Sequence, residues 1–137
     1  MPIAAAHADG VIRVKSANSF DETLARLKAD VQAKGIRFFD NIDQTGLGAA
    51  ADLKIGRSTL VLFGNPPLGV QFLQANRYAG LDWPVRMLVV EESDGSVWVA
   101  WTDFAFIAKR YTIADKDAQL KMASEVAASI AAASTAR

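Results

Sequence analysis

Aspartates are the residues of this chain best suited to chemistry, because several of them stand at the ends of expected strands. Asp40 and Asp43 flank the end of one strand, Asp82 precedes a Trp-Pro pair, and Asp103 ends a later strand. Two carboxylates in one cleft can transfer protons or bind a hard cation. Asp103 also has a simpler interpretation, as one half of a cross-strand ion pair with Arg86. No residue is therefore assigned as catalytic.

Histidine and cysteine, the commonest general bases, nucleophiles and metal ligands, are nearly missing from the chain. It has no cysteine, and its one histidine, His7, lies in the expected N-terminal tail. A Ser-His-Asp or Cys-His arrangement therefore cannot be built in the folded body, and a His-rich or thiolate metal site is excluded in the same way. A typical haem ligand set is also missing. We accordingly expect no metal and no cofactor.

The segment Gly64–Gly69, GNPPLG, has the glycine frame of a phosphate-binding loop but lacks its chemistry. The chain continues with Val-Gln where such a loop has Lys and Ser or Thr, and two consecutive prolines remove N–H donors. We interpret the segment as a strand-to-helix turn, with Asn65 as N-cap and Pro66 as the first helical residue. An anion site at the N–H groups of Leu68 and Gly69 stays open. The candidate ligand-binding residues are Asn65, Pro66, Leu68, Gly69, Arg86 and Asp103.

Alternating strands and helices must position these residues. Ser19 and Glu22 have the spacing of a capping box at the start of one helix, and Gly35 ends that helix. The stretch Ser58–Phe63 is apolar on both sides, which predicts a central strand covered on both faces. We expect further strands at Gly10–Lys15 and Ile36–Ile42 and in a later hairpin, and further helices at Thr45–Leu53, from Pro66 to about Asn76, and at Asp115–Ala133.

Asp94-Gly95 closes the hairpin, and a two-residue turn there determines every cross-strand pair. Ser93 then faces Ser96, and Arg86 faces Asp103. In this register both faces of the hairpin carry large apolar residues, whereas a small antiparallel sheet usually leaves one face polar. Exposing Met87, Val89 and Trp98 as a patch would be unusual for a monomeric protein, so we predict a symmetric homodimer.

Length and charge limit the number of domains and the partners. With 137 residues in the chain, we expect one domain over residues 10–137. The 15 basic and 15 acidic residues give a formal net charge of +0, so the basic surface of a nucleic-acid-binding domain is missing. No apolar run has the length of a membrane span. The expected partners are therefore a second copy of the chain and a small molecule.

Residues 1–9 are expected to lack fixed structure, and they have two interpretations. The small-residue run that ends in Ala6-His7-Ala8 resembles the cleavage region of an exported protein. The alternative is a plain Ala-rich tail. The first interpretation places the protein in the periplasm or outside the cell after signal removal, and the second leaves it in the cytoplasm.

Four segments together resemble the domain-of-unknown-function 302 family: FGNP at 63–66, GLDWPVRMLVVEE at 80–92, DGSVWVAWTD at 94–103 and AKRY at 108–111. The resemblance extends over residues 10–133. It implies a compact α+β domain with a curved, mainly antiparallel sheet of about five strands, helices packed chiefly on one face, and frequent dimers. It implies no activity. The chain departs from the family pattern at Gln44, where members often have His, and at Phe104, where they often have Pro.

Three functions stay open. The first is a non-enzymatic, dimeric binding domain for a small apolar or anionic ligand near Asn65–Gly69 and Asp103. The second is an enzyme that uses Asp103 or Asp43 as base and Arg86 to hold an anion. The third is a purely structural dimer module without a ligand. A carboxylate with a strongly raised pKa in a cleft would favour the enzyme, and a closed groove at GNPPLG would favour the structural module.

Overall fold

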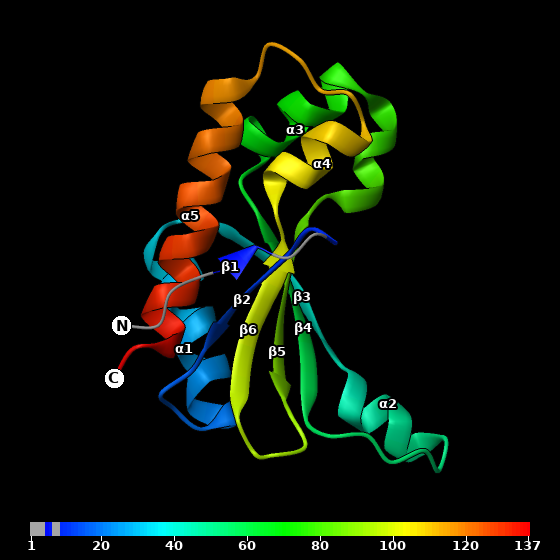
Figure 1. Ribbon diagram of the computed structural model, residues 1–137, viewed down its shortest axis with the longest axis vertical. Coiled ribbons are helices and arrows are strands. Elements are labelled where there is room, and N and C mark those ends of the chain that lie inside the picture. The colour runs from blue at the N-terminus through cyan, green and yellow to red at the C-terminus, as the bar shows by residue number, and fades with distance from the viewer. Residues whose placement is uncertain (1–4, 7–8) are drawn as a thin grey trace.

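A twisted antiparallel sheet forms the centre of the molecule (Figure 1). The computed structural model describes residues 5–6 and 9–137. The strand order in the sheet is β1-β2-β6-β5-β4-β3, and every neighbouring pair is antiparallel. The strands are β1 (Ala5–Ala6), β2 (Val11–Lys15), β3 (Arg37–Asp43), β4 (Ser58–Gly64), β5 (Val85–Glu91) and β6 (Val97–Thr102). The predicted α+β class is confirmed, and the two-residue β1 is added to the five expected strands.

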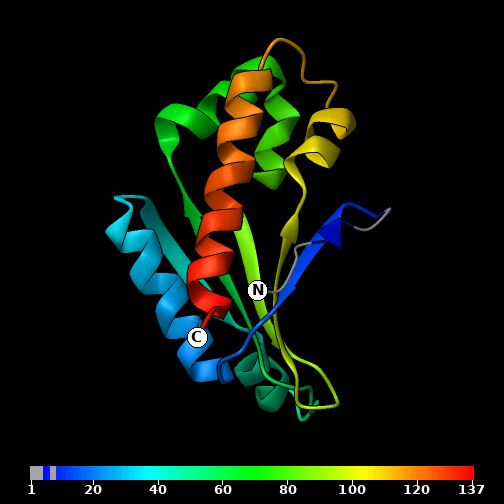
Figure 2. The ribbon, with the colours of Figure 1, turned by 60° about the vertical axis from the view of Figure 1, so that its left-hand side comes forward.

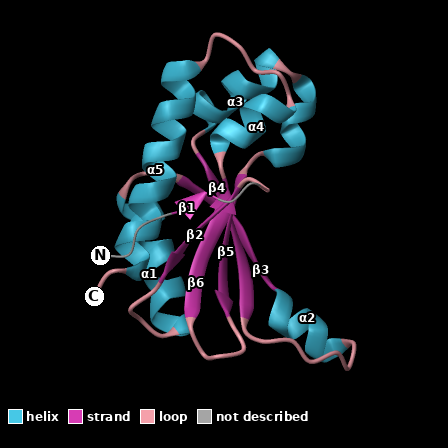
Figure 3. Ribbon diagram, viewed as in Figure 1, coloured by secondary structure: helices cyan, strands magenta, loops and turns pink. Residues whose placement is uncertain are grey.

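The helices gather on one face of the sheet and at its two ends. Figure 2 shows α1 (Phe20–Ala33) and α5 (Asp117–Thr135) side by side against one face. At one end of the sheet lie α3 (Pro66–Ala75), the 3₁₀ helix η1 (Arg77–Asp82) and α4 (Phe104–Arg110). The short α2 (Gln44–Ala50) lies at the opposite end (Figure 3). The sequence did not predict η1 and α4, because helices of six or seven residues are too short to show a periodic apolar stripe.

Local signals at the ends of α1 act largely as predicted. Ser19 is the N-cap, and its Oγ accepts a hydrogen bond from the N–H of Glu22 at 3.2 Å. The Glu22 carboxylate pairs with Nε of Arg26 at 2.8 Å, so the reciprocal half of the capping box is replaced by a helical ion pair. Gly35 follows the helix with φ +68°, a conformation that glycine adopts without a steric penalty.

A three-residue loop closes the β5–β6 hairpin, where two residues were expected. The N–H of Glu92 donates to the carbonyl of Ser96 at 2.8 Å, and Gly95 has φ +86°. This is the pattern of a type I turn followed by a left-handed glycine. The predicted two-residue turn is therefore wrong, and Ser93 does not face Ser96.

The difference of one residue exchanges the cross-strand partners along the whole hairpin. Met87 pairs with Trp101, and both side chains are buried, at 0% and 5% exposure. The same shift takes Asp103 out of register with Arg86. The predicted Arg86–Asp103 pair is therefore wrong as well.

The observed register separates the two faces of the sheet by burial. On the outer face, Leu60 and Leu62 of β4 and Leu88 of β5 are half-buried, so β4 is covered by helices on one side rather than on both. Met87 and Val89, which suggested a second copy, belong to the chain's own core. The strand residues of this core, beneath α1 and α5, are Val14, Val61, Phe63, Met87, Val89, Val97, Val99 and Trp101.

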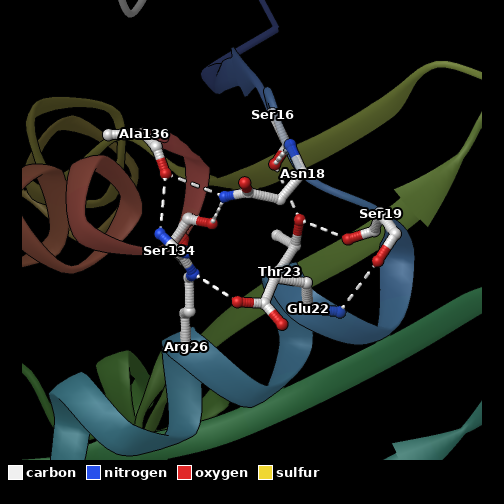
Figure 4. Close-up of polar contacts among 8 residues, drawn as sticks. All are labelled: Ser16, Asn18, Ser19, Glu22, Thr23, Arg26, Ser134 and Ala136. Carbon is white, nitrogen blue, oxygen red and sulfur yellow. Dashed lines mark hydrogen bonds and ion pairs between the residues drawn. The ribbon is translucent and has the colours of Figure 1, made fainter.

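Polar side chains of the β2–α1 connection hold the C-terminal end of α5 (Figure 4). Nδ2 of Asn18 donates to the carbonyls of Ser134 and Ala136, at 3.1 and 2.8 Å, and Nη1 of Arg26 donates to the Ala136 carbonyl at 3.0 Å. The last carbonyls of a helix have no partner within it, so these bonds satisfy groups that would otherwise need water. They hold α5 in place against α1.

The predicted tail is described only in part. Ala5 and Ala6 pair with Arg13 and Ile12, so a short strand stands where no fixed structure was expected. The other tail residues, 1–4 and 7–8, lie outside the described residues, and with them the candidate export signal and His7. Within residues 5–6 and 9–137, no helix has both the length and the apolar character to cross a membrane.

Candidate functional site

An apolar cavity of about 360 Å³ lies where the end of β4 meets α3, α5 and the residue after η1, Trp83. Phe63 from β4, Phe72 from α3 and Phe104 from α4 contribute rings that are at most 5% exposed. The α5 side of the cavity carries the small side chain of Ala127. Preformed apolar spaces of about 300–1,000 Å³ are typical of small-molecule sites. We call this space the inner cavity.

Trp83 forms part of the wall, and the two glycines of GNPPLG make room for its indole. A Cβ on Gly69 would lie 1.8 Å from the indole Nε1, and a Cβ on Gly64 would lie 2.9 Å from the ring carbon Cζ2. Phe39, at the bulge of β3, packs edge to face against the indole with ring centroids 5.7 Å apart. The glycine frame of the segment thus serves an aromatic contact rather than a phosphate.

The first turn of α3 has no free backbone N–H. Pro66 and Pro67 have none, and the N–H groups of Leu68 and Gly69 both donate to the carbonyl of Asn65, at 3.0 and 2.8 Å. An anion at this helix start would therefore lack backbone N–H donors. Asn65 stands at the N-cap position as predicted, but its side chain makes no capping hydrogen bond. Its amide is exposed at the edge of the inner cavity.

Arg86 belongs to an ion cluster centred on Asp82, whose side chain is 5% exposed. The carboxylate accepts hydrogen bonds from Arg86 at 2.5 Å, from Arg110 at 3.2 Å and from the hydroxyl of Tyr111 at 2.5 Å. The hydrogen bond to Asp82 raises the pKa of Tyr111, because it favours the protonated phenol. The cluster joins η1, β5 and α4 and holds the chain next to Trp83.

The two aspartates considered as catalytic bases are helix caps. Oδ1 of Asp103 accepts from the N–H of Ala105 at 3.1 Å, at the start of α4, and Oδ1 of Asp43 accepts from the N–H of Gly46 at 3.0 Å, at the start of α2. Neither residue lines the inner cavity. Among the described residues, no group of three His, Cys, Asp or Glu side chains is placed to hold a metal ion.

Lys34 supplies the charge in the lining of the inner cavity. Its ammonium forms an ion pair with Asp30, one turn earlier on α1. The two side chains are 28% and 19% exposed, so the pair is partly shielded from water. The positive charge at the cavity edge is therefore already matched by a carboxylate.

Half of the sequence-derived candidates meet in the inner cavity. The structure brings together Asn65, Leu68 and Gly69 in its lining. Arg86 lines a separate space of about 10 Å³, which is no larger than a single water requires. Outside the lining of the inner cavity lie Pro66, Arg86 and Asp103.

Trp83, Phe104 and the α5 wall were not among the candidate site residues predicted from the sequence, which favours a core role for the aromatic side chains. Phe104 and α5 reach the cavity only through tertiary packing, because they are distant from GNPPLG along the chain. A signal for Trp83 was present in the two glycines of that segment, since glycines five residues apart can accept one large ring against the backbone.

Comparisons with known proteins agree on the fold. The family model described as "Domain of unknown function DUF302" matches residues 12–136. The crystal structure of an uncharacterized conserved protein DUF302 from Bacillus stearothermophilus is similar, with a TM-score of 0.81, and the match covers 90% of this chain and 97% of that one. The sequence identity of that pair is 15%, so the likeness is one of fold.

Curated proteins with a different name share sequence with the chain. "Fluoride-specific ion channel FluC 1" of Brucella suis biovar 1 (strain 1330) and the protein of the same name from Brucella abortus biovar 1 (strain 9-941) are each 33% identical over 112 residues. The match covers 82% of this chain but 44% and 42% of the two relatives. The chain thus spans less than half of their length.

Proposed function

Because the chain belongs to the DUF302 family, whose name assigns no activity, we propose a function from the geometry of the site. The protein is a non-enzymatic binding domain that holds a small apolar molecule in the inner cavity. The observation that carries this proposal is the cavity itself, about 360 Å³ of apolar space walled by aromatic rings.

The walls of the inner cavity favour binding because they are already in place. Phe63, Phe72 and Phe104 are part of the core, so little side-chain freedom is lost when a ligand enters. An apolar ligand would gain about 25 cal/mol for each Å² of apolar surface removed from water. A preformed apolar space therefore supports binding without any catalytic group.

Binding is favoured over catalysis by the positions of the carboxylates. Asp43 and Asp103 cap helices, and Asp82 is paired with two arginines. The polar side-chain groups in the cavity lining are the Lys34 ammonium, the Asn65 amide and the Trp83 indole N–H, and none of them is the imidazole or carboxylate that most often acts as a general base.

Toluene is a suitable probe of the proposal, because it is apolar and has no head group. We expect saturable binding of toluene, seen as amide chemical-shift changes in α3 and α5. Ala127→Leu adds volume inside the inner cavity and should abolish the binding. Ala133→Leu, on the exposed side of the same helix, is the matched control and should leave it unchanged. Shifts that do not saturate, or that survive Ala127→Leu, would refute the proposed site.

The proposal also includes a homodimer. Its interface is the outer face of the sheet, which is the face opposite α1 and α5. The observed register places Leu60, Leu62, Leu88, Val90 and Trp98 on that face, all of them half-buried. For a contiguous apolar surface of this kind, contact with a second copy of the chain is more favourable than exposure to water.

Charge supports a second copy as the occupant of the outer face. Arg13 and Lys15 of β2 flank the apolar residues on one side, and Asp40 of β3 flanks them on the other. A twofold axis that lies in the interface, parallel to the strands and over the middle of the face, would bring the basic side of one protomer to the acidic side of its partner.

Sedimentation tests the dimer directly. We expect a dimer at micromolar concentration and a shift to monomer in Leu88→Lys, with Ala133→Lys as the control that keeps the dimer. A monomeric wild-type chain would refute this part of the proposal, and it would leave the inner cavity unaffected.

The relatives named as fluoride channels suggest a second candidate function. In it, the domain binds a ligand as a partner of a fluoride channel. The 33% identity over 112 residues favours this idea, although the chain spans 44% of the relative's length. In this proposal the aligned part of the relatives is a ligand-binding unit joined to the channel, and it does not itself hold fluoride. A titration of this chain with sodium fluoride, with sodium chloride as control, should give no fluoride-specific saturable shifts. Saturable fluoride shifts would favour an ion-binding role instead.

A further inference from the structure

A second space continues the inner cavity outward between α3 and α5. It measures about 310 Å³ and is more open, and we call it the outer groove. Asn65, Leu68 and Met122 line both spaces, so the two form one site with an inner and an outer part. A ligand longer than the inner cavity would extend into the outer groove.

The outer groove is lined by uncharged amides. Gln71 of α3 and Gln119 of α5 face each other across it, with Nε2 of Gln119 bonded to Oε1 of Gln71 at 3.1 Å. Asn65 stands where the groove meets the inner cavity, and its amide makes no capping hydrogen bond. No charged side chain belongs to the described lining of this groove.

The polar atoms around the site offer hydrogen bonds but no net charge. The first turn of α3 has no free N–H, because the N–H groups of Leu68 and Gly69 are bonded to Asn65. The ammonium of Lys34 is matched by Asp30. An ionised head group beside Asn65 would meet no unmatched opposite charge among the described lining residues, whereas a neutral head group needs only the hydrogen bonds that the amides offer.

We propose that the ligand of this site is an uncharged amphiphile. Its apolar body fills the inner cavity, and a neutral head group, such as an amide, carbonyl or hydroxyl, bonds to the amide of Asn65 in the outer groove. This inference rests on the proposed function and adds the chemical class of the ligand. It replaces the anionic alternative of the sequence analysis.

Octanamide and octanoate test the inference, since they share an alkyl chain and differ in the charge of the head group at neutral pH. Calorimetry should give at least about tenfold tighter binding of octanamide than of octanoate to the full chain. Asn65→Leu should weaken octanamide by about fivefold or more relative to toluene measured on the same variant, because toluene has no head group that loses a hydrogen bond. Gln32→Leu, at an exposed amide of α1, is the matched control, and Gln119→Leu provides a second variant of the groove.

The outcomes separate this inference from the proposed function. The neutral head group is overturned if octanoate binds as tightly as octanamide or more tightly. It is also overturned if neither Asn65→Leu nor Gln119→Leu lowers the affinity for octanamide. In both cases, binding of toluene would still support the inner cavity as a site. If neither toluene nor octanamide binds, the proposed function fails and this inference fails with it.

Discussion

The indole of Trp83 lies so close to the backbone of Gly69 that a Cβ on Gly69 would be 1.8 Å from Nε1. This contact couples the first turn of α3 to the segment that enters β5. It explains why the segment has the glycines of a phosphate-binding loop although it lacks the lysine of one. The same contact places the indole as a wall of the inner cavity, so the segment contributes to the site through packing.

Gly69→Ala should destabilise the protein, because the new Cβ must displace Trp83. We expect a loss of about 1–3 kcal/mol in the free energy of unfolding, measured by urea denaturation. Gly80→Ala is the matched control: its Cβ would meet only Leu73, at 3.8 Å, and should change stability by less than about 0.5 kcal/mol. Equal effects of the two substitutions would contradict the importance of the Trp83 contact.

Arg86 should couple to Asp82 and not to Asp103. A double-mutant cycle with Arg86→Ala and Asp82→Ala should give an interaction energy of about 1 kcal/mol, because the Asp82 carboxylate is buried while Arg86 is 45% exposed. The cycle with Asp103→Ala should give less than about 0.5 kcal/mol, and Asp103→Ala alone should cost about 1 kcal/mol as the loss of a helix cap. A larger coupling to Asp103 would restore the predicted cross-strand pair.

Tyr111 should make stability depend on pH in the alkaline range. Its pKa is raised in the folded state by the hydrogen bond to Asp82, above the ordinary value of about 10. The protonated phenol therefore adds stability below about pH 10, and this contribution is lost as the pH rises through the higher folded pKa. Unfolding free energies of the wild type and Tyr111→Phe should differ below about pH 10 and converge above the folded pKa. A constant difference across this range would rule out the linkage.

Asn18 should stabilise the end of α5 through its amide N–H groups. Asn18→Ala removes two hydrogen bonds to the carbonyls of Ser134 and Ala136 and should cost about 1–2 kcal/mol of unfolding free energy. Asn18→Asp keeps the size of the side chain but lacks the donor, so it should cost at least as much. If Asn18→Asp is as stable as the wild type, the two bonds that Nδ2 of Asn18 donates in Figure 4 do not stabilise the protein. Thermal unfolding followed by circular dichroism measures both variants.

Predictions that rest on a few neighbouring residues succeeded. Ser19 caps α1, Gly35 ends it with a positive φ, and Pro66 begins α3. These signals act within one turn of the chain, so the sequence contains all the atoms involved. The family resemblance extended this success to the whole fold.

The hairpin register failed because it depends on one residue in the loop. Asp94-Gly95 is compatible with a two-residue turn and with a three-residue loop whose last residue is glycine. Hydrogen bonding between Glu92 and Ser96 selects the second. Since side chains alternate between the faces of a strand, this single difference put Met87 and Val89 on the same face as Trp98 in the prediction, whereas the structure buries Met87 and Val89 and leaves Trp98 on the outer face.

The sequence by itself determined the order of the five main strands and of α1, α2, α3 and α5, the two ends of α1, and the family. It could do so because caps, glycines and apolar periodicity act locally. Tertiary structure alone decided which faces are buried, that Arg86 pairs with Asp82, and that GNPPLG, Trp83 and Ala127 share one cavity. The segment GNPPLG, Trp83 and Ala127 are far apart in the chain, and the space among them exists only once β4, α3 and α5 have packed. A cavity is a property of side-chain volumes that meet in three dimensions, and no local pattern records it.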